Sequence, residues 1–478
     1  MKLPKEVQEI IKKLNKAGHE GYAVGGCVRD LLLSRKPEDW DVTTDATPEE
    51  IQKIFPENFY ENKFGTVTVK TGSEDESLKE IEITPFRIET IYKDKRHPEE
   101  VQFVKKLDED LSRRDFTINA MAMNGDGKII DLFEGQSDLK KKLIRTVGEP
   151  AKRFGEDALR LLRAVRIATT LGFDIEKNTF EAIGKNAEWL RAISKERIRD
   201  EFVKIIESDR ADEGVLLLEE TNLLQYIAPE LREGIGVDQN LHHIYPVWEH
   251  SLRALKYATN KKYSLAVRLA SLFHDIGKPR SKRGETHENS TFYGHEVIGS
   301  RMVAGIMEHL RFPKELCEKV IKLVRYHMFF YMPDTVTESS VRRLLANVGK
   351  ENIEDLLKVR EADRIGSGRP KAIPYKLRHL KYIVDKVSHD PISVKMLKVN
   401  GEDVMQKLDI KPGPKVGLML NSLLAEVIDD PIKNEKEYLM KRIHELDKKS
   451  PEELKKALDT IEEAVDKEEK ERMKKYYV

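Results

Sequence analysis

VGGCVRDLLLSRKPEDWDVTTDA, residues 24–46, places two glycines, an arginine and two closely spaced aspartates in one short span that is typical of a strand, a turn and a helix. In an extended segment alternate side chains share a face. Asp39 and Asp41 are therefore expected on the same side, with Cα atoms about 6.5 Å apart, and Trp40 on the other. Two carboxylates at that spacing suit one or two Mg²⁺ ions, which prefer oxygen ligands and often bridge substrate phosphates. A polar turn is the alternative.

The residues before the aspartates favour an anion site. Gly25 and Gly26 permit close approach of the backbone, and a helix expected to begin near Val28 offers free N–H groups to an anion. Arg29 adds a charge that can bind in a bidentate manner. A plain tight turn explains the glycines equally well. The span as a whole predicts a phosphate cradle beside a pair of metal-binding carboxylates.

The hydrophobic pattern divides the chain near Gly148. Between residues 20 and 145, alternating runs such as FGTVTVK (64–70) and EIEIT (80–84) predict strands among helical segments, and so an α/β unit with a small sheet. Glu82, on the second run, is a candidate third carboxylate, although an exposed strand face explains it nearly as well. After Gly148, apolar residues recur at spacings of three and four, which predicts a mainly helical remainder.

Length and composition limit the class of protein. A chain of 478 residues is expected to form three or more domains. Its 35% of charged residues and the lack of an apolar run near the roughly 20 residues that span a bilayer predict a protein that does not enter the membrane. Two cysteines, Cys27 and Cys317, and an N-terminal segment without a secretory apolar core predict a reducing, cytoplasmic location. The sequence leaves the oligomeric state open.

Two arginine-rich segments follow. In DLSRRDFTINAMA (110–122), Arg113, Arg114 and Asp115 precede an apolar run. The paired arginines are candidates to hold a triphosphate, and surface salt bridges are the alternative, favoured if the motif stood alone.

In GEDALRLLRAVR (155–166), Asp157, Arg160 and Arg163 recur at every third residue and share about a third of the helix circumference, with Arg166 at the flank. The opposite face is apolar, so the pattern predicts one helix that is anchored on one side and presents charge on the other. Cytosine and adenine each present an amino donor beside a ring-nitrogen acceptor. Asp157 and Arg160 are complementary to that pair and would oppose uracil and guanine. A solvated charged face is the alternative.

These motifs, GGCVRD, EDWDVTTDATPEE, RRDFTINAMA, GKIIDLFEGQSDLKKKLIRTVGEP and EDALRLLRAVR, in this order and spacing, resemble the class II tRNA nucleotidyltransferase and bacterial poly(A) polymerase family. The resemblance implies an α+β fold, in which a nucleotidyltransferase palm with a small mixed sheet precedes an extended all-α region. The expected domains are a head at 1–147, a neck at 148–208, a body connection at 209–240, an HD domain at 241–370 and a helical tail at 371–478 that contacts tRNA.

The resemblance also implies roles for single residues. Asp39 and Asp41 are expected to be the catalytic carboxylates that bind Mg²⁺. The implied nucleotide-binding residues are Gly26, Arg29, Arg114, Asp157, Arg160, Arg163 and Arg166. The implied reaction adds CCA to the 3′ end of tRNA from CTP and ATP and releases pyrophosphate.

Residues 86–103 resemble a flexible loop that CC-adding members of the family lack, with Arg87 and Glu89 at its entry. Addition of CC alone is therefore disfavoured. An A-adding enzyme and a bacterial poly(A) polymerase share most of the motifs and remain alternatives.

A second group of candidate ligands lies between residues 242 and 363. Imidazole and carboxylate side chains on successive helices suit a divalent transition metal such as nickel, manganese or cobalt. The pattern resembles the HD-domain phosphohydrolases, in which His250, His274, Asp275 and Asp363 would bind one metal, with His295 and His327 near a second. Each histidine alone is more simply a surface or core residue. A different class of function follows if the head is inactive, namely a metal-dependent phosphohydrolase.

Overall fold

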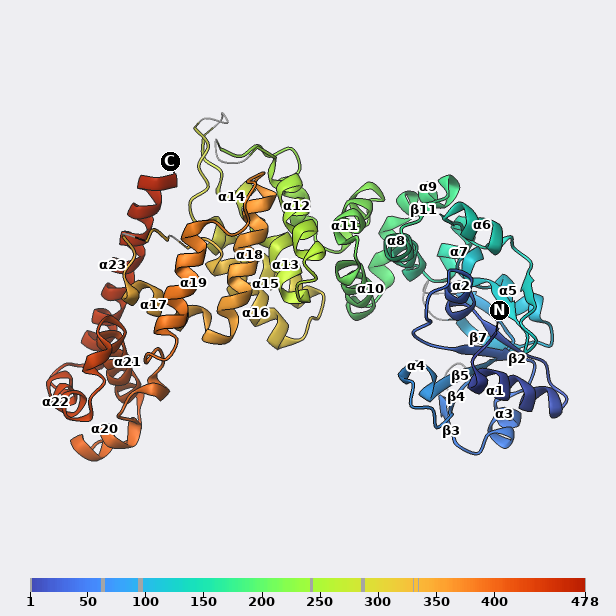
Figure 1. Cartoon of the computed structure of the whole chain (residues 1–478), viewed down its shortest axis with the longest axis horizontal. Helices are drawn as coiled ribbons and strands as arrows, with labels where there is room; N and C mark the ends of the chain where they lie inside the picture. The colour runs from blue at the N-terminus through green and yellow to red at the C-terminus, as the bar shows by residue number, and fades with distance from the viewer. Residues whose placement is uncertain are drawn as a thin grey trace. The chain divides into compact units, whose positions relative to one another are not determined.

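A computed structural model describes residues 2–61, 65–92, 98–240, 244–284, 289–329, 331–333 and 335–477. The chain forms two compact units (Figure 1). Unit 1 comprises Met1–Ile235, Thr259–Leu265 and Gly305–Pro313, and unit 2 comprises Gly236–Ala258, Ala266–Ala304 and Lys314–Val478. The finer division into five domains remains a prediction.

Unit 1 begins with an α+β head built on one mixed sheet, as predicted. The strand order is β3-β4-β5-β2-β1-β8-β9, in which β2 and β5 run parallel and the other neighbours run antiparallel. The strands are β1 (Gly21–Val24), β2 (Asp41–Thr44), β3 (Asn58–Glu61), β4 (Thr66–Lys70), β5 (Glu80–Pro85), β8 (Met121–Met123) and β9 (Ile129–Asp131).

The alternating residues of the central strands supply the core of the head. On β5, Ile81 and Ile83 are fully buried, whereas the alternating residues Glu80 and Glu82 are exposed. Helix α1 (Lys5–Lys16) adds its apolar stripe of Val7, Ile10, Ile11 and Leu14. The other helices of the head are α2 (Gly26–Leu32), α3 (Pro48–Ile54), α4 (Glu76–Lys79), α5 (Leu107–Ser112) and α6 (Gly135–Lys141).

Two local expectations about the head need correction. Helix α2 begins at Gly26 rather than near Val28, because Gly25, with φ of 87°, turns the chain directly from β1 into the helix. The segment expected to be a flexible loop contains two paired strands, β6 (Arg87–Tyr92) and β7 (Pro98–Phe103). Residues 93–97 of this segment, the side chain of Glu89 and Phe64 of the FGTVTVK run lie outside the described residues.

The helical region of unit 1 follows the head. Its elements are α7 (Pro150–Glu156), α8 (Leu159–Leu171), α9 (Lys177–Lys185), α10 (Lys195–Glu207) and α11 (Ala211–Glu220), with a short parallel pair of β10 (Leu143–Ile144) and β11 (Asp174–Ile175). The single helix expected across residues 155–166 is wrong. Asp157 has extended backbone angles, φ of −140° and ψ of 108°, so the chain breaks between α7 and α8.

Unit 2 is helical. Its first part contains α12 (Val247–Asn260), α13 (Leu265–Phe273), α14 (Lys278–Ser281), α15 (His295–His309), α16 (Lys314–Tyr326), α17 (Glu338–Val348), α18 (Ile353–Gly366) and α19 (Tyr375–Val387). The tail has a core of its own, in which Val404, Leu423, Val427, Leu439 and Ile443 are fully buried. It is formed by α20 (Gly401–Leu408), α21 (Pro414–Asp429), α22 (Lys436–Asp447) and α23 (Pro451–Tyr477). Within the described residues, we find no helix with the length and apolarity to cross a bilayer.

Candidate active sites

Three carboxylates gather at the start of β2. Asp41 is the first residue of this strand, and in the parallel pairing with β5 it lies opposite Glu82. Trp40 is buried and Asp39 exposed, as alternation predicts. Burial and the nearby charge of Asp39 raise the pKa of Asp41 to about 6, and Glu82 adds to this shift. Acids that oppose each other's ionisation form a place where a divalent cation lowers the repulsion, so this site fits a metal ion.

The glycine turn brings the backbone and an arginine against these acids. A Cβ atom on Gly25 would lie 3.1 Å from Nη1 of Arg114 and 3.7 Å from Oδ2 of Asp41. Gly25 is therefore required both by its positive φ and by the space that the two side chains occupy. The charge of Arg114 also lowers the pKa of Asp41, against the effect of burial. The turn, the metal-binding candidates and a cation meet at one point.

Arg29 lies on helix α2, which follows the glycine turn, and hydrogen bonds hold its side chain in place. Its Nε and Nη2 donate to the carboxylate of Asp30 at 2.9 and 2.8 Å, and its Nη1 donates to Oδ1 of Asn119 at 2.8 Å. A Cβ on Gly26 would lie 3.6 Å from Nη2 of Arg29. The structure therefore brings these two predicted nucleotide-binding residues together.

The paired arginines converge on one buried acid that the sequence analysis missed. Arg113 donates to Oδ1 of Asp110 at 3.0 and 2.7 Å, and Arg114 donates to Oδ2 at 3.3 Å. Asp110 is completely buried, and Thr43 of β2 lies 3.5 Å from its Oδ2. The alternative of surface salt bridges is thus wrong in its location, because the shared partner is interior. Its spacing of three and four residues before the arginines on a helix is the signal that could have revealed it.

Asp115 links the segment that carries Arg113 and Arg114 to helix α8. Its Oδ2 accepts from Nε and Nη2 of Arg163 at 2.9 and 2.6 Å, and its Oδ1 accepts from the Asn119 amide at 3.2 Å. Burial alone would raise the pKa of Asp115, but Arg163 and Arg160 hold it well below the usual range. Asn119 therefore links Asp115 to Arg29, a connection for which the sequence carries no local signal.

The charged face predicted on α8 is paired with acids rather than presented to solvent. Arg160 is buried and donates to Glu156 at 2.6 Å and to the Arg113 carbonyl at 3.1 Å. Arg166 donates to Glu201 of α10 at 2.6 Å. The expectation of an exposed arginine face is wrong for Arg160, because α7 folds back beside α8 and supplies its partner. The spacing of four residues between Glu156 and Arg160 was a usable signal.

Asp157 lies at the break between α7 and α8. Its Oδ1 accepts the backbone N–H of Leu159 at 2.9 Å, and its Oδ2 accepts from Arg197 of α10 at 2.8 Å. The Arg197 contact, 40 residues away in the chain, was not foreseen. Arg87, expected at the entry of the loop, is the first residue of β6.

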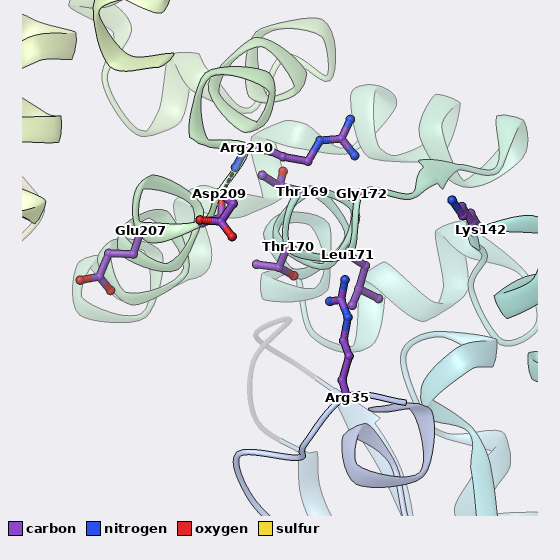
Figure 2. Close-up of a pocket in the computed structure, with 10 residues that line it drawn as sticks. Arg35, Lys142, Thr169, Thr170, Leu171, Gly172, Glu207, Asp209 and Arg210 are labelled. Carbon is purple, nitrogen blue, oxygen red and sulfur yellow. Dashed lines mark hydrogen bonds between the residues drawn. The ribbon is translucent and has the colours of Figure 1, made fainter. Parts of the chain in front are cut away.

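A polar pocket of about 520 Å³ lies on the helical region of unit 1 (Figure 2). In Figure 2, Arg35 extends toward the end of α8 and Arg210 lies across Gly172. A Cβ on Gly172 would clash with Nη1 of Arg210. The pocket includes none of the residues predicted to bind nucleotide or metal. Its lining is Arg35, Lys142, Thr169, Thr170, Leu171, Gly172, Glu207, Ser208, Asp209 and Arg210.

In unit 2, four histidines and an aspartate of the predicted HD site converge. Oδ2 of Asp275 lies 3.0 Å from Nε2 of His250 and 3.2 Å from Nε2 of His274, and its Oδ1 lies 3.3 Å from Nε2 of His295 and 3.6 Å from Nε2 of His327. The sets His250–His274–Asp275 and Asp275–His295–His327 can each hold a metal ion. All five side chains are buried.

The backbone fixes the direction of three of these rings. Nδ1 of His274, His295 and His327 lies 2.8, 2.8 and 2.7 Å from a carbonyl oxygen three residues earlier in the chain. Because a carbonyl only accepts, each Nδ1 carries the proton and each Nε2 is left to face Asp275. This arrangement is typical of metal-binding histidines, whose second nitrogen is oriented by a backbone or carboxylate oxygen.

The remaining groups complete the electrostatics of the centre. Oδ1 of Asp363 lies 3.4 Å from Nε2 of His250, so the fourth predicted ligand faces the same point. Burial lowers the pKa of His274, but Asp275 and Asp363 outweigh it and raise that pKa to about 10. Burial lowers the pKa of His327 to about 4. Lys278, which the sequence analysis missed, lies 2.6 Å from Oδ2 of Asp275.

Three regions of the chain match known protein families. Residues 21–145 match the Poly A polymerase head domain, residues 172–235 match the "Probable RNA and SrmB- binding site of polymerase A", and residues 247–367 match the HD domain. The chain is therefore a nucleotidyltransferase that also carries an HD domain.

The full-length relatives narrow the class. The CCA-adding enzyme of Ligilactobacillus salivarius is 32% identical over 449 residues, which cover 92% of this chain and 96% of that protein. The structure of the Bacillus stearothermophilus CCA-adding enzyme in complex with CTP is 31% identical, covers 94% of this chain and 98% of its own, and has a TM-score of 0.68. The Thermotoga maritima CCA-adding enzyme, described in complex with tRNA, shares the fold at 19% identity, with 92% of this chain and 94% of its own covered and a TM-score of 0.51.

This chain belongs to the family of CCA-adding enzymes. The family resemblance expected from the sequence is thus confirmed.

Proposed function

We propose that this chain adds CCA to the 3′ end of tRNA from CTP and ATP, with release of pyrophosphate. One observation carries the assignment: within a member of this family, Asp41, Glu82, Arg114 and the turn at Gly25 meet at one edge of the sheet. The proposed substrates imply a cytoplasmic location. The CTP complex of one relative and the tRNA complex of another support the choice of partners.

In the proposed mechanism Asp39 and Asp41 hold the metal ion. Carboxylates without nitrogen or sulfur ligands suit Mg²⁺, which when bound supplies positive charge to the reacting phosphate and eases deprotonation of the tRNA 3′-hydroxyl. The raised pKa of Asp41, about 6, supports this role, because a cation is the partner that would restore its ionised form.

Arg29 and Arg114 bind the triphosphate in this proposal. Each is already oriented by acceptors of its own, Arg29 by Asp30 and Asn119 and Arg114 by Asp110. A side chain fixed in this way loses little conformational freedom when it binds phosphate, so its charge stabilises the transition state with little reorganisation.

Asp157 and Arg160 select the base. The carboxylate would accept from the amino group of cytosine or adenine, and the guanidinium would donate to the adjacent ring nitrogen. In the structure Arg197 donates to Asp157, and Arg160 donates to Glu156 and to the Arg113 carbonyl, so a base has to compete with these contacts. Exchange of one set of charged hydrogen bonds for another keeps the cost of binding small and penalises uracil and guanine, which mismatch both groups.

A nucleotide-incorporation assay tests this function against the A-adding and poly(A)-polymerase alternatives. The protein and Mg²⁺ are incubated with tRNAs that end before CCA, after C and after CC, with CTP and ATP supplied separately and together. We expect C addition to the two shorter tRNAs and a single terminal A on the third. Addition of A alone would establish the A-adding alternative, and long A tails would establish a poly(A) polymerase.

A second function, hydrolysis of phosphate esters by the HD centre, is favoured by the two ligand sets that share Asp275. Nickel, manganese or cobalt suits these nitrogen and oxygen donors, and a bound ion would polarise a phosphate and activate water. Esters at damaged RNA 3′ ends, including 2′,3′-cyclic phosphates, are the proposed substrates. The His274→Ala/Asp275→Ala variant is expected to lose metal-dependent phosphatase activity and to keep nucleotide addition. Unchanged phosphatase activity would refute this second function.

A further inference from the structure

An exposed cluster of aromatic rings lies on α19, outside both candidate sites. Tyr375 and Tyr382 are 63% and 62% exposed. The ring of His379 lies between them, with centroid distances of 5.9 Å to Tyr375 and 6.2 Å to Tyr382. Tyr331 is buried beneath, and its hydroxyl bonds to Nδ1 of His379. We call these four residues the Tyr–His cluster.

The rings share one face of the helix by their spacing. Positions 375, 379 and 382 are four and three residues apart, which places their side chains in one row. Tyr331 fixes the central ring, so the cluster presents ordered aromatic surfaces to solvent rather than loose side chains. Tyrosine rings ordinarily pack at least partly in the core of a protein. The exposure of these two rings therefore indicates a binding role.

The charge around the cluster is positive. Residues 369–386 contain six lysines and arginines and a single acid, Asp385. Arg378 is exposed and donates to the Ile373 carbonyl, and exposed Lys376 contacts the sulfur of Met332. In the part of the chain that the structure describes, neither cation is neutralised by an acid.

Aromatic faces in a basic surrounding suit single-stranded RNA. Unpaired bases stack on tyrosine and histidine rings, and lysine and arginine neutralise the phosphates between them. A protein partner would instead be expected to cover apolar side chains away from so much like charge, because charged residues are depleted at the centre of protein interfaces.

The cluster is tied to the elements of the HD centre. Tyr331 follows the predicted ligand His327 by four residues. On the other side, Lys381 of α19 pairs at 3.2 Å with Glu361, a buried residue of α18 that precedes the predicted ligand Asp363 by two residues. α19 is therefore in contact with residues that lie two and four positions from these predicted ligands, all within unit 2.

We propose that the Tyr–His cluster, with Lys376 and Arg378, binds an unpaired RNA segment and makes an RNA end, rather than a free nucleotide, the substrate of the HD centre. The second part rests on the proposed phosphohydrolase function. The first part, RNA binding, stands on the cluster and its charge alone.

The test uses the full chain and the Tyr375→Ala/Tyr382→Ala variant, in which two exposed side chains are truncated. Ile432→Ala, a change of an 83% exposed apolar residue in the same unit, is the matched control. Fluorescence polarisation measures binding of a labelled single-stranded RNA with a 3′-phosphate. Release of phosphate from that RNA and hydrolysis of p-nitrophenyl phosphate are measured with added manganese or nickel.

We expect the double variant to bind the RNA about tenfold more weakly or worse and to raise KM for its 3′-phosphate, while hydrolysis of p-nitrophenyl phosphate is unchanged. Unchanged RNA affinity, the outcome for a protein-binding surface, would overturn the site. Weaker RNA binding with unaltered hydrolysis of the RNA end would overturn the link to the HD centre. If the unmodified chain hydrolyses neither substrate, the phosphohydrolase proposal and that link fall, and the affinity measurement still decides the RNA site.

Discussion

The carboxylate site of the head and the histidine centre of unit 2 both contain acidic side chains, but different groups balance the negative charge in the two sites. In the head, the acids lie beside arginines that already have acid partners of their own, and Asp41 keeps a pKa raised to about 6. In unit 2, the balancing groups are titratable imidazoles whose rings are fixed by backbone carbonyls. The head therefore leaves a partly buried acid with a raised pKa, and the HD centre surrounds its acid with oriented imidazoles.

Among the substitutions that test this comparison, Asp41→Asn is expected to have the largest effect on activity. It removes the charge of a proposed metal ligand but keeps the size of the side chain, so nucleotide addition is predicted to fall by roughly 10³-fold. Incorporation of labelled CTP into tRNA measures this loss. Glu80→Gln, an exposed neutralisation on the neighbouring strand β5, is the control and is expected to retain activity. Activity near the unmodified level in Asp41→Asn would mean that the head site does not use this carboxylate.

A loss of stability is predicted for Asp115→Asn. The variant leaves Arg163 without its buried partner, which costs about 3 kcal/mol. Urea unfolding followed by tryptophan fluorescence measures it, since Trp40 and Trp189 both lie in unit 1. The double variant Asp115→Asn/Arg163→Met should recover part of the loss, because it also removes the unpaired cation. Equal stability of the single variant and the unmodified chain would show that this ion pair contributes nothing.

A smaller loss of activity is expected from Glu82→Gln. Glu82 is exposed and opposite Asp41, so in the proposed mechanism it strengthens the field at the metal without being one of the two proposed ligands. We predict that addition falls about tenfold and that higher Mg²⁺ restores part of it, which a titration of rate against Mg²⁺ would reveal. A loss as large as that of Asp41→Asn would make Glu82 an equal ligand.

The smallest expected effect is the pH dependence of the unfolding free energy. Arg163 and Arg160 depress the pKa of Asp115 in the folded protein, so its stabilising contribution is complete above the unfolded pKa of about 4 and is lost as the pH falls below it. The difference in unfolding free energy between the unmodified chain and Asp115→Asn should thus be constant from pH 7 to about 5 and shrink near pH 3. A difference that grows in acid would contradict the assigned shift.

The sequence was most informative where function depends on spacing. Alternation along a strand placed Asp39 and Asp41 on one side of Trp40, and the side chains predicted as ligands of the HD centre converge in the structure. The ion-pair partners of the charged residues were harder to predict from the sequence. Asp115 and Arg163 are 48 residues apart, and Asp157 and Arg197 are 40 apart, so only the folded chain reveals those pairs.

The break at Asp157 was missed for a different reason. The apolar residues that follow it continue a helical pattern, and an aspartate that accepts the backbone N–H of Leu159 just before the next helix leaves that pattern intact. Asp157, one of the two residues proposed to select the base, lies at this break and Arg160 lies on α8, so their spacing of three residues does not reflect one helical face.

The claim that one chain carries two separate metal-dependent sites is tested most directly on three matched samples: the unmodified protein, Asp39→Asn/Asp41→Asn and His250→Ala/His274→Ala. Nucleotide addition and tightly bound transition metal, by elemental analysis, are measured on each. We predict that the aspartate variant loses addition and keeps the metal, and that the histidine variant loses the metal and keeps addition. Loss of both properties in either variant would contradict the account.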